Sequence, residues 1–212
     1  MKNLKRLAIP LALLPLLLLM GQEQPAQSAD ESSDIAGAIA QALLTTAKPS
    51  TKLEEFSQRK NAVIVRGFTD VSTIPGEDGA SLAITAVELQ DITNQTKEYG
   101  LVIHIDSGHQ RTSLAYIDLD EIDALTNALD YLQKVDKPVT QLANFEAQYR
   151  TRGDLWLTNG NANGTRLVAI RTTHLEPAGE FTSAIAYFRP ASLADIRQQI
   201  INAKQMLDKL HG

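Results

Sequence analysis

Two stretches of the sequence, residues 60–137 and 141–212, contain the same order of local patterns. In each stretch, four short segments of alternating apolar and polar residues precede one segment with apolar residues every three or four positions. The first pattern is typical of a half-buried strand and the second of an amphipathic helix. Because the strand segments follow one another closely, we expect two antiparallel four-stranded sheets, each followed by a helix. This is an α+β fold, a single domain made of two similar halves.

Short turns separate the expected strands. In the second strand, Leu82, Ile84 and Ala86 share one face, but the phase changes near Val87, where we expect a β-bulge. In the second half, the loop NGNANG is expected to form a hairpin turn, because Asn-Gly tolerates the positive φ values of such turns. The expected strands lie within NAVIVRGF, ASLAITAVELQDI, KEYGLVIHID and RTSLAYID in the first half, and within NFEAQYRTR, DLWLT, GTRLVAIRTTH and EFTSAIAYF in the second.

Three segments have the spacing of amphipathic helices. Residues 34–47 predict a short helix within an N-terminal linker at 30–59. For the helix of the first half we expect Asp118 as the N-cap, in a capping box with Glu121. For the helix of the second half we expect Ser192 as the N-cap. The apolar stripe of this last helix consists of Leu193, Ile196, Ile200, Ala203, Leu207 and Leu210.

The two halves are also similar where the fourth strand leads into the helix. The sequences are SLAYIDLDEIDALTNAL and SAIAYFRPASLADIRQQI, and both contain Ala-Tyr followed by an apolar residue. Tyr116 and Tyr187 occupy the matching positions, 71 residues apart. This distance is too long for a solenoid repeat and fits a duplicated half-domain. A chance similarity between two strand-to-helix junctions is the alternative.

The tandem order of four strands and a helix resembles the PUR-repeat and Whirly proteins. The resemblance covers residues 60–210 and rests on the order of elements and on the AYI and AYF junctions. It implies two curved sheets that interlock and are crossed by their helices, and it implies binding of single-stranded nucleic acid. The sequence departs from that family in being acidic, in its expected export, and in lacking a basic, aromatic-rich sheet pattern. The resemblance therefore supports the fold more than the ligand.

The N-terminus has the three parts of a secretory signal peptide. Lys2, Lys5 and Arg6 precede an uninterrupted apolar run at 7–20, and a polar segment rich in small residues follows. We expect a signal peptide at 1–29 and a secreted or periplasmic protein with no transmembrane segment after cleavage. An uncleaved amphipathic or buried helix is the alternative. The chain has no Cys, so its core must be stable without disulfides.

Charge favours some partners over others. Loss of the signal peptide would remove three basic residues and one acidic residue, changing the formal net charge from −5 to about −7. An acidic chain is a poor partner for nucleic acid or anionic lipid. Residues 60–140 hold 13 acidic and 6 basic side chains, whereas residues 141–212 hold 6 and 8. This asymmetry favours either a head-to-tail homodimer or a protein partner in the cell envelope.

Few residue patterns in the sequence point to catalysis. His104, Asp106 and His109 are weak candidates for a metal site, and a metal-dependent hydrolase is one alternative function. A solvated strand face followed by a polar turn also explains these three residues. No G-x-S-x-G or H-E-x-x-H pattern is present, so we expect no catalytic residues and no cofactor. Asn94 and Asn163 match the N-glycosylation pattern, which matters only in a host that glycosylates.

The most suggestive segment for binding is YRTRGDLW. Strand alternation that buries Leu155 and Leu157 exposes Trp156. A Trp among Arg side chains can bind a partner through cation–π contacts and apolar burial. Packing of this Trp beneath a helix or the other sheet is the alternative. We expect a non-catalytic binding or structural domain, with a single-stranded nucleic-acid-binding protein as an alternative. The candidate binding residues are Tyr149, Arg150, Arg152, Trp156 and Arg171.

Overall fold

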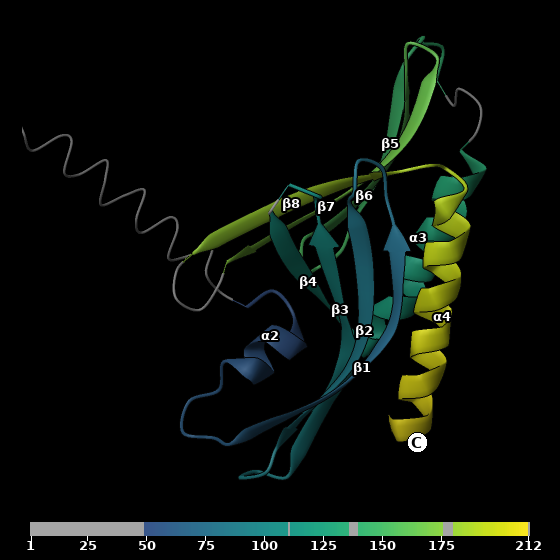
Figure 1. The fold of residues 1–212 in the computed structure, drawn as a ribbon. Coiled ribbons are helices and arrows are strands. Elements are labelled where there is room, and N and C mark those ends of the chain that lie inside the picture. Colours follow the sequence, from purple (N-terminus) through teal and green to yellow (C-terminus); the bar gives the residue numbers. More distant parts are fainter. Residues whose placement is uncertain (1–48, 110, 136–139, 176–179, 212) are drawn as a thin grey trace, which may run out of the picture. The chain divides into compact units, whose positions relative to one another are not determined.

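The computed structural model describes residues 49–109, 111–135, 140–175 and 180–211. The expected signal peptide at 1–29 and the expected helix at 34–47 lie outside these residues. Within them, two antiparallel four-stranded sheets form, ordered β1-β2-β3-β4 and β5-β6-β7-β8, and a helix follows each sheet (Figure 1). The predicted α+β fold with two similar halves is therefore confirmed.

The elements follow the predicted order. One additional short helix, α2 (Lys52–Ser57), precedes the first sheet, in a segment expected to be linker. Ser192, expected as an N-cap, is the first residue of the last helix. The elements of the first half are β1 (Ile64–Pro75), β2 (Ser81–Asp91), β3 (Thr96–Asp106), β4 (Thr112–Asp118), the 3₁₀ turn η1 (Leu119–Glu121) and α3 (Ile122–Lys134). Those of the second half are β5 (Phe145–Arg150), β6 (Leu155–Ala162), β7 (Thr165–Leu175), β8 (Phe181–Phe188) and α4 (Ser192–His211).

The helices exchange sheets between the halves. Helix α4 packs on β1, β2 and β3 of the first sheet, and α3 packs on β5, β6 and α4 (Figure 1). One continuous apolar core results, in which Ile84 and Ile103 of the first sheet join Ile200 of α4 and Ile170 of the second sheet. Neither half can bury its sheet without the helix of the other, so the two halves form one cooperative unit.

The phase change in β2 has a different cause from the one predicted. The pairing of β2 with β3 is continuous, so β2 contains no bulge there. Instead, β2 is buried on both faces: Ile84 faces the shared core, whereas Val87 packs on the opposite face with Leu53 and Phe56 of α2. The bulge lies in the neighbouring strand β1, between Asp70 and Ser72. Because α2 covers the outer face of β2, apolar residues occur on both faces of this strand, and the resulting change of phase resembles that of a bulge.

The hairpin between β6 and β7 is tighter than predicted. Only Asn163 and Gly164, with φ values of 52° and 81°, form the turn, while Ala162 already pairs with Thr165. The other residues of NGNANG belong to β6. Asn159 is buried there. Its side-chain amide donates to the Leu132 carbonyl at 2.7 Å, near the end of α3, and this bond offsets the cost of burying the amide. This bond attaches the first-half helix to the second sheet.

Candidate functional site

The predicted binding residues separate into two places in the structure. Arg150, Trp156 and Arg171 lie together on the outward face of the second sheet. Arg152 lies in the turn between β5 and β6 and points elsewhere. Tyr149 lies on the inward face of β5, half-buried against the shared core, and this burial raises the pKa of its phenol. The structure therefore groups three of the predicted binding residues on one face and places Arg152 and Tyr149 apart from them.

Trp156 lies between two arginines in a row that crosses the sheet. The strand register places Arg150 directly opposite Trp156, and Trp156 directly opposite Arg171. The two guanidinium carbons lie 4.6 and 4.8 Å from the centroid of the indole ring. Leu155 and Leu157 on either side point into the core, so the indole is on the outward face. Two cation–π contacts of this kind favour one orientation of the indole ring.

Three exposed apolar side chains extend this row into a larger surface. Ile185 of β8 lies opposite Arg171, and Tyr187 lies two residues further along β8, opposite Ala169. Leu167 lies on the same face of β7, four residues before Arg171 and opposite Gly160 of β6. Their exposed fractions are 39%, 43% and 45%. These three residues were not among the predicted binding residues, although they stand at alternating positions with the buried residues of β7 and β8. We call this surface the Trp156 face; it consists of Arg150, Trp156, Leu167, Arg171, Ile185 and Tyr187.

The two arginines of the Trp156 face differ in charge pairing. Arg150 donates from its Nε to Asp154 Oδ1 at 2.6 Å, so a carboxylate next to it neutralises its charge. Arg171 makes the cation–π contact but no ion pair with any carboxylate of the described residues. The Trp156 face thus offers an aromatic ring, three apolar side chains and one cation that no carboxylate of the described residues pairs. Such a surface suits a partner with apolar groups and a nearby anion.

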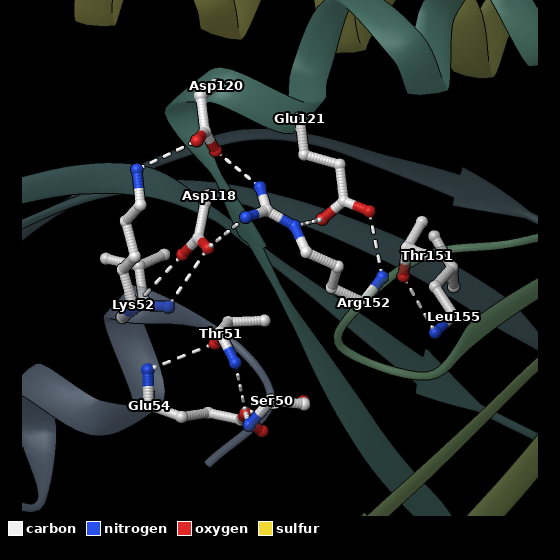
Figure 2. Close-up of polar contacts among 11 residues, drawn as sticks. Ser50, Thr51, Lys52, Glu54, Asp118, Asp120, Glu121, Thr151, Arg152 and Leu155 are labelled. Atoms are coloured by element: carbon white, nitrogen blue, oxygen red, sulfur yellow. Dashed lines mark hydrogen bonds and ion pairs between the residues drawn. The ribbon is translucent and has the colours of Figure 1, made fainter.

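Arg152 belongs to a second cluster, which joins the two halves (Figure 2). Its guanidinium lies 3.5 Å from Asp118 and 3.4 Å from Glu121, and it also forms an ion pair with Asp120. Its backbone amide donates to Glu121 Oε1 at 2.8 Å. Lys52 of α2 completes the group through Asp120, at 2.8 Å. We call these five residues the junction cluster: they connect α2, the start of α3 and the β5–β6 turn.

The junction cluster replaces the predicted capping box. Asp118 makes no hydrogen bond to the helix that follows it. Its two carboxylate oxygens instead accept the backbone amides of Lys52 and Leu53, each at 3.0 Å, at the start of α2. Glu121 is drawn to Arg152, and the chain enters α3 through a 3₁₀ turn. The free amides of another helix and a nearby guanidinium are better partners for these carboxylates than their own helix.

A true capping box occurs at α2, where the sequence analysis did not expect one. Thr51 Oγ1 accepts the amide of Glu54 at 3.1 Å, and the Glu54 carboxylate accepts the amide of Thr51 at 3.1 Å. Glu54 also lies 3.4 Å from Nδ1 of the buried His174 on β7. Burial alone would raise the pKa of Glu54, but hydrogen bonds from His174, Ser50 and Thr51 outweigh it and lower the pKa to about 2. Helix α2 is therefore fixed to both sheets.

The weak metal candidates are not brought together. His104 and Asp106 share one face of β3, but among the described residues no three His, Asp or Glu side chains are grouped closely enough to hold a metal ion. The Asp106 carboxylate accepts the amide of Gly108 at 2.8 Å, which stabilises the turn after β3. His109 is exposed in that turn. The residues form a polar turn at the end of a strand.

The comparisons with known proteins found no matching family model and no matching curated protein. In the part of the chain that the structure describes, no helix has the length and apolarity needed to cross a membrane. The geometry of the described residues is therefore the basis for assigning a function.

Proposed function

We propose that this chain is an exported, non-catalytic binding domain and that its partner binds the Trp156 face. One observation carries the proposal: Trp156 is held between two guanidinium groups on an outward sheet face that none of the described helices covers. Aromatic and arginine side chains contribute most of the binding energy at many protein interfaces. A ring that is already fixed loses little conformational entropy when a partner binds.

The chemistry of the Trp156 face favours a protein partner. Its side chains lie on all four strands of the second sheet, a width of about 14 Å for three strand spacings. Leu167, Ile185 and Tyr187 provide apolar area around the indole. Arg171 provides one cation, which suits an Asp or Glu side chain next to an apolar group on the partner. The signal-peptide pattern of the N-terminus supports a partner in the cell envelope or outside the cell.

Site-specific photocrosslinking in the producing cell tests this proposal. A photoreactive amino acid replaces Tyr187 on the Trp156 face and, in a matched control, Tyr131 on α3, which is 70% exposed. We expect a discrete crosslinked partner from position 187 and none from position 131. The purified partner should then bind Trp156→Ala and Arg171→Glu at least about tenfold more weakly than wild type. Equal crosslinking from both positions, or unchanged affinity of both variants, would overturn the proposal.

One observation favours a second candidate function, the binding of single-stranded nucleic acid. The structure places Tyr187 on the same sheet face as Trp156 and two arginines, a grouping that the sequence pattern did not reveal. Aromatic rings and cations on a sheet suit base stacking and phosphate contacts. Fluorescence anisotropy with an oligo-dT probe at 50 mM salt tests this function. Binding that weakens steeply with salt would favour it, and no binding at micromolar protein would dismiss it.

A further inference from the structure

The edge of the first sheet is a long strand with an unpaired side. Strand β1 is the terminal strand of its sheet, and it pairs only with β2 among the described residues. Several of its side chains are exposed, including Val65 at 48% and Phe68 at 66%. Most natural proteins protect such an edge, because its free amides and carbonyls can pair with another strand. An exposed apolar edge strand therefore suggests a pairing partner.

The backbone hydrogen bonds show which groups this edge offers. The amide of Ile92 donates to the carbonyl of Val63 at 3.1 Å, so Val63 directs its carbonyl toward β2. Hydrogen-bonding direction alternates along an antiparallel pair. Residues 65, 67 and 69 therefore also face β2. Arg66, Phe68 and Asp70 direct their amides and carbonyls to the free edge.

The charges along this edge would be complementary if two β1 strands paired with each other in antiparallel orientation. Arg66 lies two residues before Phe68, and Asp70 lies two residues after it. If two β1 strands pair antiparallel about Phe68, each Arg66 lies opposite an Asp70 and the two Phe68 side chains meet. A pairing centred on Arg66 or on Asp70 would instead place like charges opposite each other, which is destabilising. Of the pairings centred on an outward-facing residue of this segment, charge therefore favours the one centred on Phe68.

We propose that two copies of this chain associate through antiparallel pairing of their β1 strands, centred on Phe68, to form a continuous eight-stranded sheet. The Arg66 guanidinium already lies 5.6 Å from the centroid of the Phe68 ring, on the face that Asp70 shares. Thr85 donates to Asp70 Oδ1 at 2.9 Å and holds that carboxylate in place. The bulge after Asp70 ends the regular edge. The paired segment is therefore short, which gives a weak, concentration-dependent dimer with two-fold symmetry.

A charge-swap experiment tests the pairing and its register. Arg66→Asp places two Asp side chains opposite each other at both ends of the pairing, and Asp70→Arg does the same with Arg. By sedimentation velocity on the full processed protein, each variant alone should dimerise at least about tenfold more weakly than wild type. An equimolar mixture should recover the wild-type dimer, because every Asp then faces an Arg. Asp195→Arg on the exposed start of α4 is the matched control and should dimerise as wild type does.

A backbone variant gives a second, independent test. Phe68→Pro removes an amide that points to the free edge, so the monomer should fold as wild type does and the dimer should be lost. Circular dichroism and thermal unfolding establish that the variant is folded. A wild-type protein that stays monomeric at several hundred micromolar would overturn the proposal. So would a dimer that is unaffected by the charge reversals, since it would form through another surface.

Discussion

The two halves of the molecule have the same order of four strands and a helix, and they differ in what covers the outer face of each sheet. In the first half, α2 packs on that face, and Tyr116 lies beneath with its ring 5.8 Å from that of His174. In the second half no described helix covers the outer face, and the matching residue Tyr187 is exposed. The same strand-to-helix junction thus supports a packed surface in one half and an open one in the other.

This difference indicates which sheet face is available to a partner. The elements that both halves share, the sheets and the exchanged helices, build the core. The element present only once, α2, determines which sheet face is available. The Trp156 face is therefore open because the second half has no counterpart of α2 among the described residues.

The difference between the covered and the open outer face can be tested by removing one aromatic side chain from each face. Phe56 of α2 is 1% exposed and packs against the first sheet. Phe56→Ala should lower the free energy of unfolding by about 3 to 5 kcal/mol, because it leaves a cavity under the helix. Tyr187→Ala on the open face is the matched control and should cost less than about 1 kcal/mol. Chemical denaturation measures both, and similar losses for the two variants would contradict the comparison.

A smaller effect is expected when the attachment of α2 is removed but its apolar packing is kept. Asp118→Ala removes the carboxylate that accepts both amides at the start of α2 and that faces Arg152. Asp118 is buried, so the loss of the cap and of the ion pair should destabilise the fold by about 2 to 3 kcal/mol. Asp120→Ala removes a solvent-exposed member of the same cluster and should cost less than about 1 kcal/mol. Equal losses of stability for the two variants would mean that the Asp118 carboxylate does not hold α2 in place.

The pH dependence of stability should also come from the covered half. The pKa of Glu54 is about 2 in the folded protein and near 4.5 when the residue is free. The folded state therefore binds this proton more weakly, and Glu54 stabilises the fold above about pH 4.5. That contribution decreases as the pH falls from 4.5 toward 2.

A comparison with Glu54→Gln isolates this contribution. Unfolding by urea at several pH values should show a steeper acid loss for wild type than for the variant. Parallel curves for the two proteins would show that the contacts of Glu54 with His174, Ser50 and Thr51 do not stabilise its charged form.

Local sequence patterns were sufficient to predict most of the fold. The period of two and the helical spacing located all eight strands and both long helices, because most of these elements alternate buried and exposed positions over part of their length. The patterns failed for α2, whose short segment KLEEFS contains only two apolar residues in contact with the sheet. Thr51 and Glu54 were the available signal, since Thr-x-x-Glu is the capping-box spacing.

The site was harder to predict because its contacts are distant in sequence. Alternation predicted that Trp156 faces away from Leu155 and Leu157, as the structure has it, but only the strand register shows that it lies between Arg150 and Arg171. It failed for Arg152, because β5 ends at Arg150 and alternation no longer applies in the turn that follows. The partners of Arg152 lie 31 to 34 residues away at the start of the other half's helix. Only the packing of the two halves brings them together.

The smallest expected effect concerns the positive charge on the open face of the second sheet. The fluorescence of Trp156 can measure it, because Trp156 is the only Trp in the chain. Iodide is attracted to the guanidinium of Arg171, which has no ion-pair partner among the described residues, and this attraction should raise the local iodide concentration near the indole. Iodide should therefore quench the fluorescence more effectively in wild type than in Arg171→Gln, by a factor below about two. The neutral quencher acrylamide should not distinguish the two proteins, and added salt should reduce the difference.

Lys209→Gln on the exposed end of α4 is the matched control for this loss of one positive charge. It should leave iodide quenching unchanged, because a distant cation is screened over roughly 8 to 10 Å at physiological salt. If both variants reduced quenching equally, the effect would reflect net charge. A loss confined to Arg171→Gln would instead establish an accessible cation beside the fixed indole. That combination distinguishes the open face of the second half from the covered face of the first.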